Sequence, residues 1–285
     1  MKTELYTTTM ACLLLTAALP VMAGHVKPQK DMPQLRSSAV LVLDESDSSV
    51  LLSKQADVPT PIASITKLMT ALVVLDDNQA LDEPLIVTDA DREHGRGAYS
   101  RLAVGTRLTR ADLLHLALMS SENRAAHALG RNYPGGVPAF VQEMNRKAVA
   151  LGMRSAHFVD PSGLSSDNVA SPADLVILVN AAAQHPVIRQ YSTDQGASVR
   201  VGRRLLEYRN TDLLVRSPTW NIIVQKTGYI TEAGRCLVLK AVIKGRSVVM
   251  VLLDSFGKYT RTADAQRIRK WLEARLSDLA TASPV

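Results

Sequence analysis

The segment from Pro61 to Leu75 constrains the fold most, because it is apolar on nearly every side. It is long enough for a helix, contains no glycine, and carries the apolar residues Ile62, Ile65, Leu68, Met69, Leu72, Val73 and Val74. A helix that is hydrophobic all round is normally covered by other elements on every side. We therefore expect a buried central helix, with Ser64 near its start.

The rest of the chain predicts elements that can cover this helix. Ala39–Asp44 and Val50–Leu52 flank a polar turn and predict a β-hairpin. The middle predicts three helices, which are Thr109–Arg131 with a capping box, Pro138–Leu151 stopped by Gly152, and one from the cap Ser171 to Pro186. Three strands and an amphipathic helix follow: Asn221–Lys226, Cys236–Ile243, Val248–Asp254 and Thr260–Leu279. The order predicts an α+β fold, an antiparallel β-sheet flanked by helices with an inserted all-helical lobe.

The N-terminal residues predict export. An apolar run from Met10 to Val21 is closed by Val21-Met22-Ala23, so we interpret residues 1–23 as a cleaved signal peptide. The run is short for a membrane span, which needs about 20 residues. We expect a flexible tether at 24–36, one domain of two interleaved subdomains at 37–280, and a tail at 281–285.

Cysteine content and charge narrow the classes of protein. Cys12 lies in the leader, so Cys236 alone remains, which excludes an internal disulfide and indicates a buried strand residue. Loss of Lys2 and Glu4 with the leader keeps the net charge at +6, which suits an acidic polymer or an anionic membrane surface. Scattered Lys and Arg, few aromatic residues and no nucleic-acid motif argue against nucleic acid as a partner.

A metal centre is not expected. The histidines His94, His115, His127, His157 and His185 are well separated, and neither a His-Glu-x-x-His motif nor paired cysteines occur. We expect each to be a surface or helix residue, and we expect no cofactor.

Ser64-Ile65-Thr66-Lys67 is the first candidate for chemistry. Residues three apart share a helix face, so the Lys67 amine can reach the Ser64 hydroxyl. A serine needs a base to become a good nucleophile, and burial at a helix start would favour a neutral lysine. Alone, the pair is equally explained as a capping serine and a lysine whose head reaches solvent.

Two further triplets carry suitable groups. Ser121-Glu122-Asn123 interrupts an apolar stretch, where a hydroxyl can relay a proton and an amide can hold a substrate. Lys226-Thr227-Gly228 ends the strand begun at Asn221, where a cation and a hydroxyl can hold a carboxylate and the glycine admits a substrate backbone. Taken singly, the first is an ordinary helix–loop junction and the second an ordinary strand end.

Together and in this order, the three triplets resemble the Ser-x-x-Lys, Ser-x-Asn and Lys-Thr-Gly motifs of penicillin-binding proteins and serine β-lactamases. The likeness covers nearly the whole mature chain and narrows to the penicillin-binding protein 7/8 group, the D-alanyl-D-alanine endopeptidases. Four stretches carry it: Pro61–Thr70, Leu118–Ala126, Tyr133–Gly136 and Phe256–Tyr259. The resemblance implies a β-lactamase/D,D-peptidase-like fold and a periplasmic enzyme. We expect the chain to lack the additional β-domain and membrane-binding tail of many related carboxypeptidases.

The same resemblance implies roles in an acylation and deacylation cycle. Ser64 would attack a D-alanine carbonyl after Lys67 accepts its proton. Ser121 would pass that proton to the departing amine, and Asn123 would orient the substrate amide.

The resemblance also assigns residues that bind substrate. Lys226 and Thr227 would hold the carboxylate beside the scissile bond, and Lys226 would help keep Lys67 unprotonated. Gly228 would let the substrate lie along the strand, and the backbone N–H groups of Ser64 and Tyr229 would form the oxyanion hole.

Related activities stay open to different degrees. A class A β-lactamase needs a Glu-x-x-Leu-Asn loop, which is absent between Asn123 and Lys226, whereas Phe158–Leu164 resembles the peptidases. A carboxypeptidase would use the same triplets, and only whole-chain likeness favours an endopeptidase. A non-catalytic penicillin sensor would need a transmembrane link or a lost triplet, and neither is visible. Tyr99-Ser100-Arg101 lies in a glycine-flanked loop that either borders the cleft or is only a loop.

The expected partners follow from this resemblance. They are the peptide of peptidoglycan as substrate and β-lactam antibiotics as covalent inhibitors. We further expect a monomer that makes peripheral contact with a membrane.

Overall fold

The computed structural model describes residues 32–92 and 99–282. The predicted signal peptide, most of the predicted tether, Cys12, His94 and the last three residues lie outside the described residues. The chain from Pro33 onward forms one compact unit, and the account below concerns that unit.

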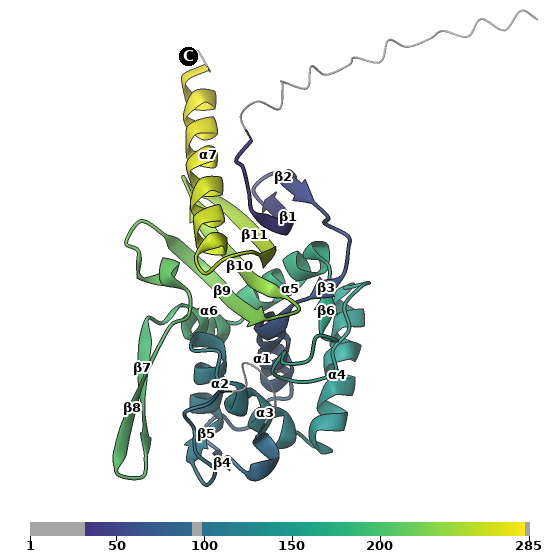
Figure 1. Cartoon of the computed structure of the whole chain (residues 1–285), viewed down its shortest axis with the longest axis vertical. Helices are drawn as coiled ribbons and strands as arrows, with labels where there is room; N and C mark the ends of the chain where they lie inside the picture. The colour runs from purple at the N-terminus through teal and green to yellow at the C-terminus, as the bar shows by residue number, and fades with distance from the viewer. Residues whose placement is uncertain (1–31, 93–98, 283–285) are drawn as a thin grey trace, which may run out of the picture. The chain divides into compact units, whose positions relative to one another are not determined.

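A five-stranded antiparallel sheet joins the two ends of this unit (Figure 1). Its strands in spatial order are β2 (Ser49–Lys54), β1 (Ser37–Asp44), β11 (Arg246–Ser255), β10 (Gly234–Ile243) and β9 (Asn221–Ile230). β1 pairs directly with β11, so that Ala39 lies opposite Leu253. The predicted hairpin and the predicted meeting of N-terminal and C-terminal strands are confirmed.

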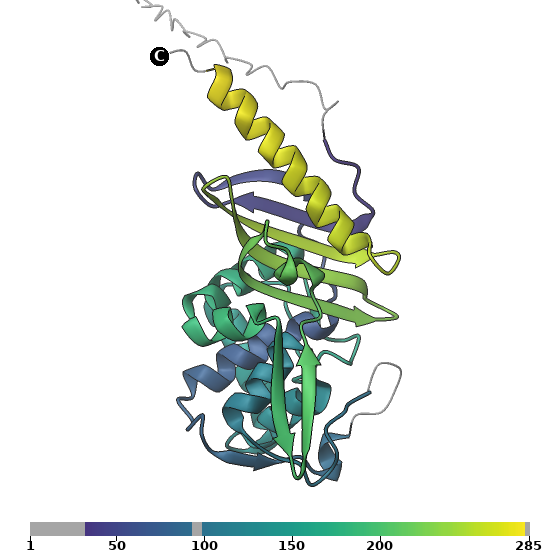
Figure 2. The same cartoon turned by 90° about the vertical axis from the view of Figure 1, so that its left-hand side faces the viewer.

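Helices cover both faces of the sheet (Figure 2). Successive side chains of a strand point to opposite faces, so the runs of apolar residues in these strands make both faces apolar. On one face, Val42 and Met250 pack with Ile268 and Leu272 of α7 (Thr260–Ala282). On the other face, Leu41 and its neighbours join a larger core that includes α5 (Pro172–Gln184). Cys236 is fully buried in β10, which confirms its predicted role as a core residue. No helix within 32–92 or 99–282 is long and apolar enough to cross a membrane.

In the helical lobe, α1 (Thr66–Asp76) is packed against α2 (Arg110–Met119), α3 (Asn123–Arg131), α4 (Gly136–Leu151) and α5, while α6 (Pro186–Thr193) packs against α2, α5 and β9. Every residue of α1 from Thr66 to Val74 is buried, which confirms the predicted central helix, but its predicted start at Pro61 is wrong, because Thr60–Pro61 form a short strand and the α-helix begins at Thr66. Ser64 precedes it in η2 (Ala63–Ile65), a turn of 3-10 helix. The predicted N-terminal caps of α2 and α5 are confirmed as reciprocal capping boxes.

The prediction of a single helix over Thr109–Arg131 is wrong, because the helix is interrupted between α2 and α3. The Ser120 hydroxyl donates to the Leu116 carbonyl at 2.8 Å, which competes with helix propagation. Ser121 then adopts a left-handed φ of 61°. Glu122 restarts the chain as the N-cap of α3, where its carboxylate accepts from the Arg124 N–H at 3.0 Å.

The predicted end of the last motif-bearing strand is also wrong, since β9 continues through Lys226–Gly228 to Ile230. The strand was predicted to end at Lys226 because a charged residue usually lies at the surface, but Lys226 is buried within the strand. Several short elements were not predicted: α6, η3 (Asp89–Asp91), η4 (Leu213–Arg216), the two-stranded sheets of β3 (Thr60–Pro61) with β6 (Val169–Ala170) and of β4 (Pro84–Ile86) with β5 (Arg107–Thr109), and the hairpin of β7 (Gly196–Val201) with β8 (Arg204–Arg209).

Candidate active site

Ser64 lies where the sheet meets the helical lobe, in a turn held on several sides. Ala63, just before it, has a φ of 48°, which residues other than glycine rarely adopt. The Thr66 hydroxyl donates to the Ala63 carbonyl at 2.8 Å, and the Ile62 N–H donates to the Asn168 carbonyl at 3.0 Å. The turn therefore presents Ser64 from a fixed and unusual backbone.

Lys67 lies one helical turn further on and is fully buried. Its Nζ is 3.0 Å from the Ser64 Oγ, 2.7 Å from the Asn123 Oδ1 and 2.6 Å from the Ser162 carbonyl oxygen. These partners come from three separate parts of the chain. The predicted contact of Lys67 with Ser64 is present in the structure, and the contact of Lys67 with Asn123 was not predicted.

A tight loop around Asp160 delivers the Ser162 carbonyl. The Asp160 carboxylate accepts from the backbone N–H groups of Ser162 and Gly163 at 2.6 Å and of Ser165 at 2.9 Å. Burial alone would raise the pKa of Asp160, but these hydrogen bonds hold it below its usual value. The carboxylate thus fixes the loop that reaches Lys67.

Ser121 and Lys226 form a second hydroxyl–amine pair beside the first. The Lys226 Nζ is 2.9 Å from the Ser121 Oγ and 2.8 Å from the Thr227 carbonyl oxygen. Complete burial lowers the pKa of Lys226 well below its usual value, and the charges of Lys67 and Arg261 lower it further, while Asp212 opposes them. The two lysines are therefore electrostatically coupled.

The edge strand β9 approaches the Ser64 turn closely at Gly228. A Cβ atom on Gly228 would lie 2.8 Å from the Ile62 carbonyl oxygen and 3.2 Å from the Ser64 backbone nitrogen. Glycine is therefore required for packing against the turn, a reason that the sequence analysis did not give. The Gly228 carbonyl accepts from the Arg261 guanidinium at 2.7 Å.

The structure brings together the candidate residues of all three motifs. Ser64, Lys67 and Asn123 are in direct contact, as are Ser121 and Lys226. Thr227, Gly228 and Tyr229 continue along β9; the Tyr229 side chain is half exposed and stacks with Arg235.

Sequence reasoning missed four residues of this region: Asp160, Thr211, Asp212 and Arg261. The Thr211 hydroxyl lies 2.6 Å from that of Thr227. Asp160 lies in the stretch that resembled the peptidases, and that was its only signal. The others occur singly in segments without a motif. In the described part of the chain, no three His, Cys, Asp or Glu side chains could together hold a metal ion.

The sequence model of peptidase family S11, described as D-alanyl-D-alanine carboxypeptidase, matches residues 26–257. The chain belongs to this family. It is 46% identical over 278 residues to a D-alanyl-D-alanine endopeptidase of Pseudomonas aeruginosa, covering 96% of this chain and 89% of that protein. It is 45% identical to the Escherichia coli protein of the same name, covering 85% and 78%.

Solved structures agree with this S11 assignment. The crystal structure of a Streptomyces DD-transpeptidase is similar with a TM-score of 0.78 and 28% identity, covering 84% of this chain and 97% of that one. A penicillin-binding protein homologue from Mycobacterium tuberculosis has a TM-score of 0.78 and 29% identity, covering 87% and 96%. The predicted fold class, the resemblance to the endopeptidase group and the assignment as a serine-type hydrolase are confirmed.

Proposed function

We propose that this S11 peptidase is a D,D-endopeptidase that hydrolyses the D-alanyl-diaminopimelate cross-links of peptidoglycan. The observation that carries the proposal is the contact of the buried Lys67 amine with the Ser64 hydroxyl at 3.0 Å. A neutral lysine at this distance can accept the proton of the hydroxyl. The similarity to proteins named D-alanyl-D-alanine endopeptidase supports the choice of substrate.

The acylation half of the cycle uses the two hydroxyl–amine pairs in turn. Lys67 accepts the Ser64 proton as the Ser64 oxygen attacks the D-alanine carbonyl carbon. Ser121 passes a proton to the departing nitrogen, the C–N bond breaks, and the acyl chain stays on Ser64 as an ester. Water then attacks the ester carbon, which releases the acid and restores the Ser64 hydroxyl.

The surrounding groups bind substrate in this proposal. Asn123 orients an amide, and Lys226 with Thr227 holds the carboxylate next to the scissile bond. Gly228 lets the substrate approach β9. The backbone N–H groups of Ser64 and Tyr229 stabilise the oxyanion, and each such donor contributes about 3 kcal/mol in the transition state.

The same nucleophile accounts for a proposed sensitivity to penicillin. The β-lactam carbonyl acylates Ser64, and the ester persists because the chain has no counterpart of the β-lactamase glutamate loop. Rapid turnover of penicillin by the purified protein would contradict this part of the proposal.

We place the enzyme in the periplasm, exported by a leader at 1–23 and tethered by residues 24–36. Its domain, residues 37–280, would work as a monomer. The net charge of +6 supports peripheral contact with an anionic surface.

A D-alanyl-D-alanine carboxypeptidase is the second candidate, because the matching family carries that description and a Streptomyces relative with that name is 28% identical. The decisive experiment gives the protein cross-linked muropeptide dimers and pentapeptide monomers in parallel. Cleavage of the dimers supports the endopeptidase, whereas release of D-alanine with intact dimers contradicts it. The Ser64→Ala variant should lose labelling by a fluorescent penicillin, and continued labelling would mean that another residue is the nucleophile.

A further inference from the structure

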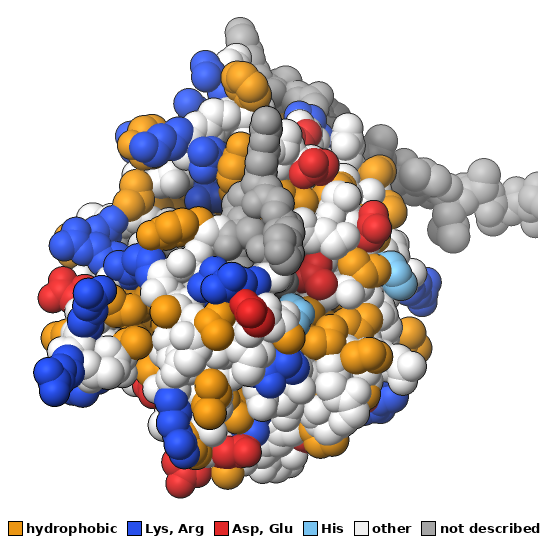
Figure 3. Space-filling model, turned by 60° about the horizontal axis from the view of Figure 1, so that its bottom comes forward, with side chains coloured by type: hydrophobic (Ala, Val, Ile, Leu, Met, Phe, Trp, Pro, Cys, Tyr) orange, Lys and Arg blue, Asp and Glu red, His pale blue; other side chains and the backbone are white. Residues whose placement is uncertain are grey.

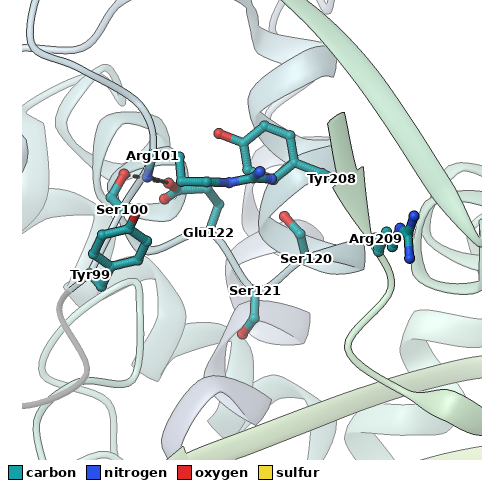
Figure 4. Close-up of a pocket in the computed structure, with 8 residues that line it drawn as sticks. All are labelled: Tyr99, Ser100, Arg101, Ser120, Ser121, Glu122, Tyr208 and Arg209. Atoms are coloured by element: carbon teal, nitrogen blue, oxygen red, sulfur yellow. Dashed lines mark hydrogen bonds between the residues drawn. The ribbon is translucent and has the colours of Figure 1, made fainter. Parts of the chain in front are cut away.

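A hollow of about 190 Å³ has Ser121, the hydroxyl partner of Lys226, in its lining (Figure 4). Its lining comes from three segments: Tyr99–Arg101, Ser120–Glu122 and the β8 residues Tyr208 and Arg209. Pockets for drug-sized ligands start at roughly 300 Å³, so this hollow fits a smaller fragment. The loop at Tyr99–Arg101 therefore borders a pocket, which was one of the two alternatives left open by the sequence.

The walls of this hollow are fastened to one another. The Glu122 carboxylate accepts from the Ser100 hydroxyl and from the Arg101 N–H. The Arg101 guanidinium donates to the Glu207 carbonyl at 2.6 Å and lies 3.9 Å from the centre of the Tyr208 ring. Figure 4 shows Arg101 extended beside that ring. The hollow is thus a built feature that joins the loop, the α2–α3 break and β8.

Tyr208 adds a polar group to the lining. Its side chain is buried, and its hydroxyl makes no hydrogen bond of ordinary geometry within residues 32–92 and 99–282, although the neighbouring Arg101 guanidinium is close enough to act on its pKa. Burial raises the pKa of Tyr208 to about 12, so the hydroxyl remains a donor at neutral pH. A buried hydroxyl without a partner is costly unless a ligand or water pairs with it.

The hollow lies on the side of the scissile bond from which the amine leaves. It is lined by Ser121, whose side chain points to the opposite side from Ser120 in Figure 4 and accepts from Lys226. Asn123 and Gly228, which contact the substrate in the proposed function, do not line it. The strand that leaves with the amine protonated by Ser121 therefore starts at the mouth of this hollow.

The charge of the surroundings suits an acidic strand. A second hollow of about 470 Å³ shares Tyr208 and Arg209 with the first and reaches Arg216. Figure 3 shows Lys and Arg side chains gathered on the side of the molecule where β7 and β8 lie. The exposed arginines of this hairpin are Arg200, Arg203, Arg204 and Arg209. Of the two acidic residues in the hollows, Glu122 is already engaged by its three hydrogen bonds.

We propose that the hollow lined by Arg101, Tyr208 and Arg209 binds the leaving peptide strand of a cross-link and makes the enzyme select dimers over single stems. This inference rests on the proposed function. Cross-link cleavage releases an anionic peptide, which is long enough to pass Ser121 and carries carboxylates for Arg209. A carboxypeptidase reaction releases a single D-alanine, and a β-lactam releases no separate strand, so neither needs the hollow.

The test compares Arg209→Ala, Arg209→Lys and Arg209→Glu with the wild-type protein on three substrates. These are cross-linked muropeptide dimers, pentapeptide monomers and fluorescent penicillin. Arg209 is exposed, and its guanidinium makes no ion pair or hydrogen bond within the described chain, so its replacement leaves the fold intact. Arg203→Ala is the matched control, because Arg203 is an exposed arginine of the same hairpin that lines neither hollow.

We expect Arg209→Ala to lower kcat/KM on dimers about tenfold, or about 1.4 kcal/mol, mainly through a higher KM. Arg209→Glu should lower kcat/KM on dimers further. Arg209→Lys should retain most of the wild-type value, because the lysine ammonium keeps the positive charge. Penicillin acylation and D-alanine release should stay within about twofold of wild type, and the Arg203 control should match wild type on all three substrates.

Three results would overturn the inference. If Arg209→Ala equals the control on dimers, the hollow does not bind the leaving strand, although the proposed function stands. If it loses activity on all three substrates alike, the effect is on the fold. If the wild-type protein acylates penicillin but leaves dimers intact, the proposed endopeptidase activity is wrong and this inference falls with it.

Discussion

Replacement of Asp160 by Asn tests whether the loop after Phe158 positions the catalytic lysine. One carboxylate oxygen accepts from the Ser165 N–H at 2.9 Å and from the Asn168 side-chain amide at 2.5 Å. In the variant, an NH2 group at this position faces two donors and leaves both without an acceptor. The other oxygen, which serves Ser162 and Gly163, can keep its role as an amide oxygen.

The expected cost follows from the two lost acceptor contacts. Hydrogen bonds to charged groups contribute about 1.5–3 kcal/mol each, and the lower end applies to this half-buried loop. We therefore expect Asp160→Asn to lower the free energy of unfolding by about 3 kcal/mol. In a domain of this size that corresponds to a fall in Tm of about 6–12 °C.

The loss should depend on pH, because hydrogen bonds hold the pKa of Asp160 below its usual value. The stability supplied by such a carboxylate is present above the unfolded pKa, about 3.9, and disappears as the pH falls through the folded pKa. The difference between wild type and variant should therefore be largest near neutral pH and shrink below about pH 4.

Activity should fall with stability, because the loop supplies the Ser162 carbonyl to the Lys67 amine at 2.6 Å. Thermal unfolding gives the Tm, and the rate of penicillin acylation well below that Tm reports on Lys67. Asp167→Asn is the control, since this exposed residue lies in the same loop, and it should stay within about 0.5 kcal/mol of wild type. An Asp160 variant that melts with wild type, or that melts early but acylates at the wild-type rate, would refute the reasoning.

Two further substitutions and one labelling experiment test other parts of the molecule. Burial raises the pKa of Asp212 from 3.8 to about 6, so between these values the folded protein keeps a proton that the unfolded chain releases, and stability falls as the pH rises through this window. Asp212→Asn should remove this pH dependence, which amounts to about 3 kcal/mol of unfolding free energy. Denaturant midpoints measured at pH 4 and pH 7 report it, and an equal change in midpoint between the two pH values for variant and wild type would contradict the prediction. Gly228→Ala should slow penicillin acylation about a hundredfold, because its Cβ would lie 2.8 Å from the Ile62 carbonyl and displace the strand from Ser64; a rate within threefold of wild type would show that the strand adapts. Burial raises the pKa of the Cys236 thiol to about 11, so a thiol reagent should label it only in denaturant, and rapid labelling of the native protein would place it at the surface.

The sequence predicted those parts of the fold that local pattern encodes. The segment at Pro61–Leu75 had no polar face, so only a buried helix could accommodate it, and α1 is that helix. The capping box at Thr109 and the cap at Ser171 were predicted because their partners lie three residues away. Such signals need no knowledge of distant contacts.

The parts that were not predicted depend on distant contacts or lack an apolar pattern. The β7–β8 hairpin exposes residues on both faces and carries arginines, so its sequence has no clean alternation. The Ser162 carbonyl meets Lys67 across 95 positions of sequence, and Arg261 meets Gly228 across 33. Nothing near these residues in the chain marks the pairing, because tertiary packing alone creates it.

A residue with a left-handed backbone lies at or next to each of the two serines of the site, and this conformation depends on distant packing. Ala63, next to Ser64, and Ser121 itself both have left-handed φ values, of 48° and 61°. Each such residue costs on the order of 1–3 kcal/mol and persists only where its surroundings enforce it. Gly163 shows how tightly they do so, because a Cβ there would lie 2.0 Å from the Ala63 carbonyl oxygen. The loop that positions Lys67 therefore also confines the turn that carries Ser64, so nucleophile and base are held by the same contacts and any change that loosens one must disturb the other.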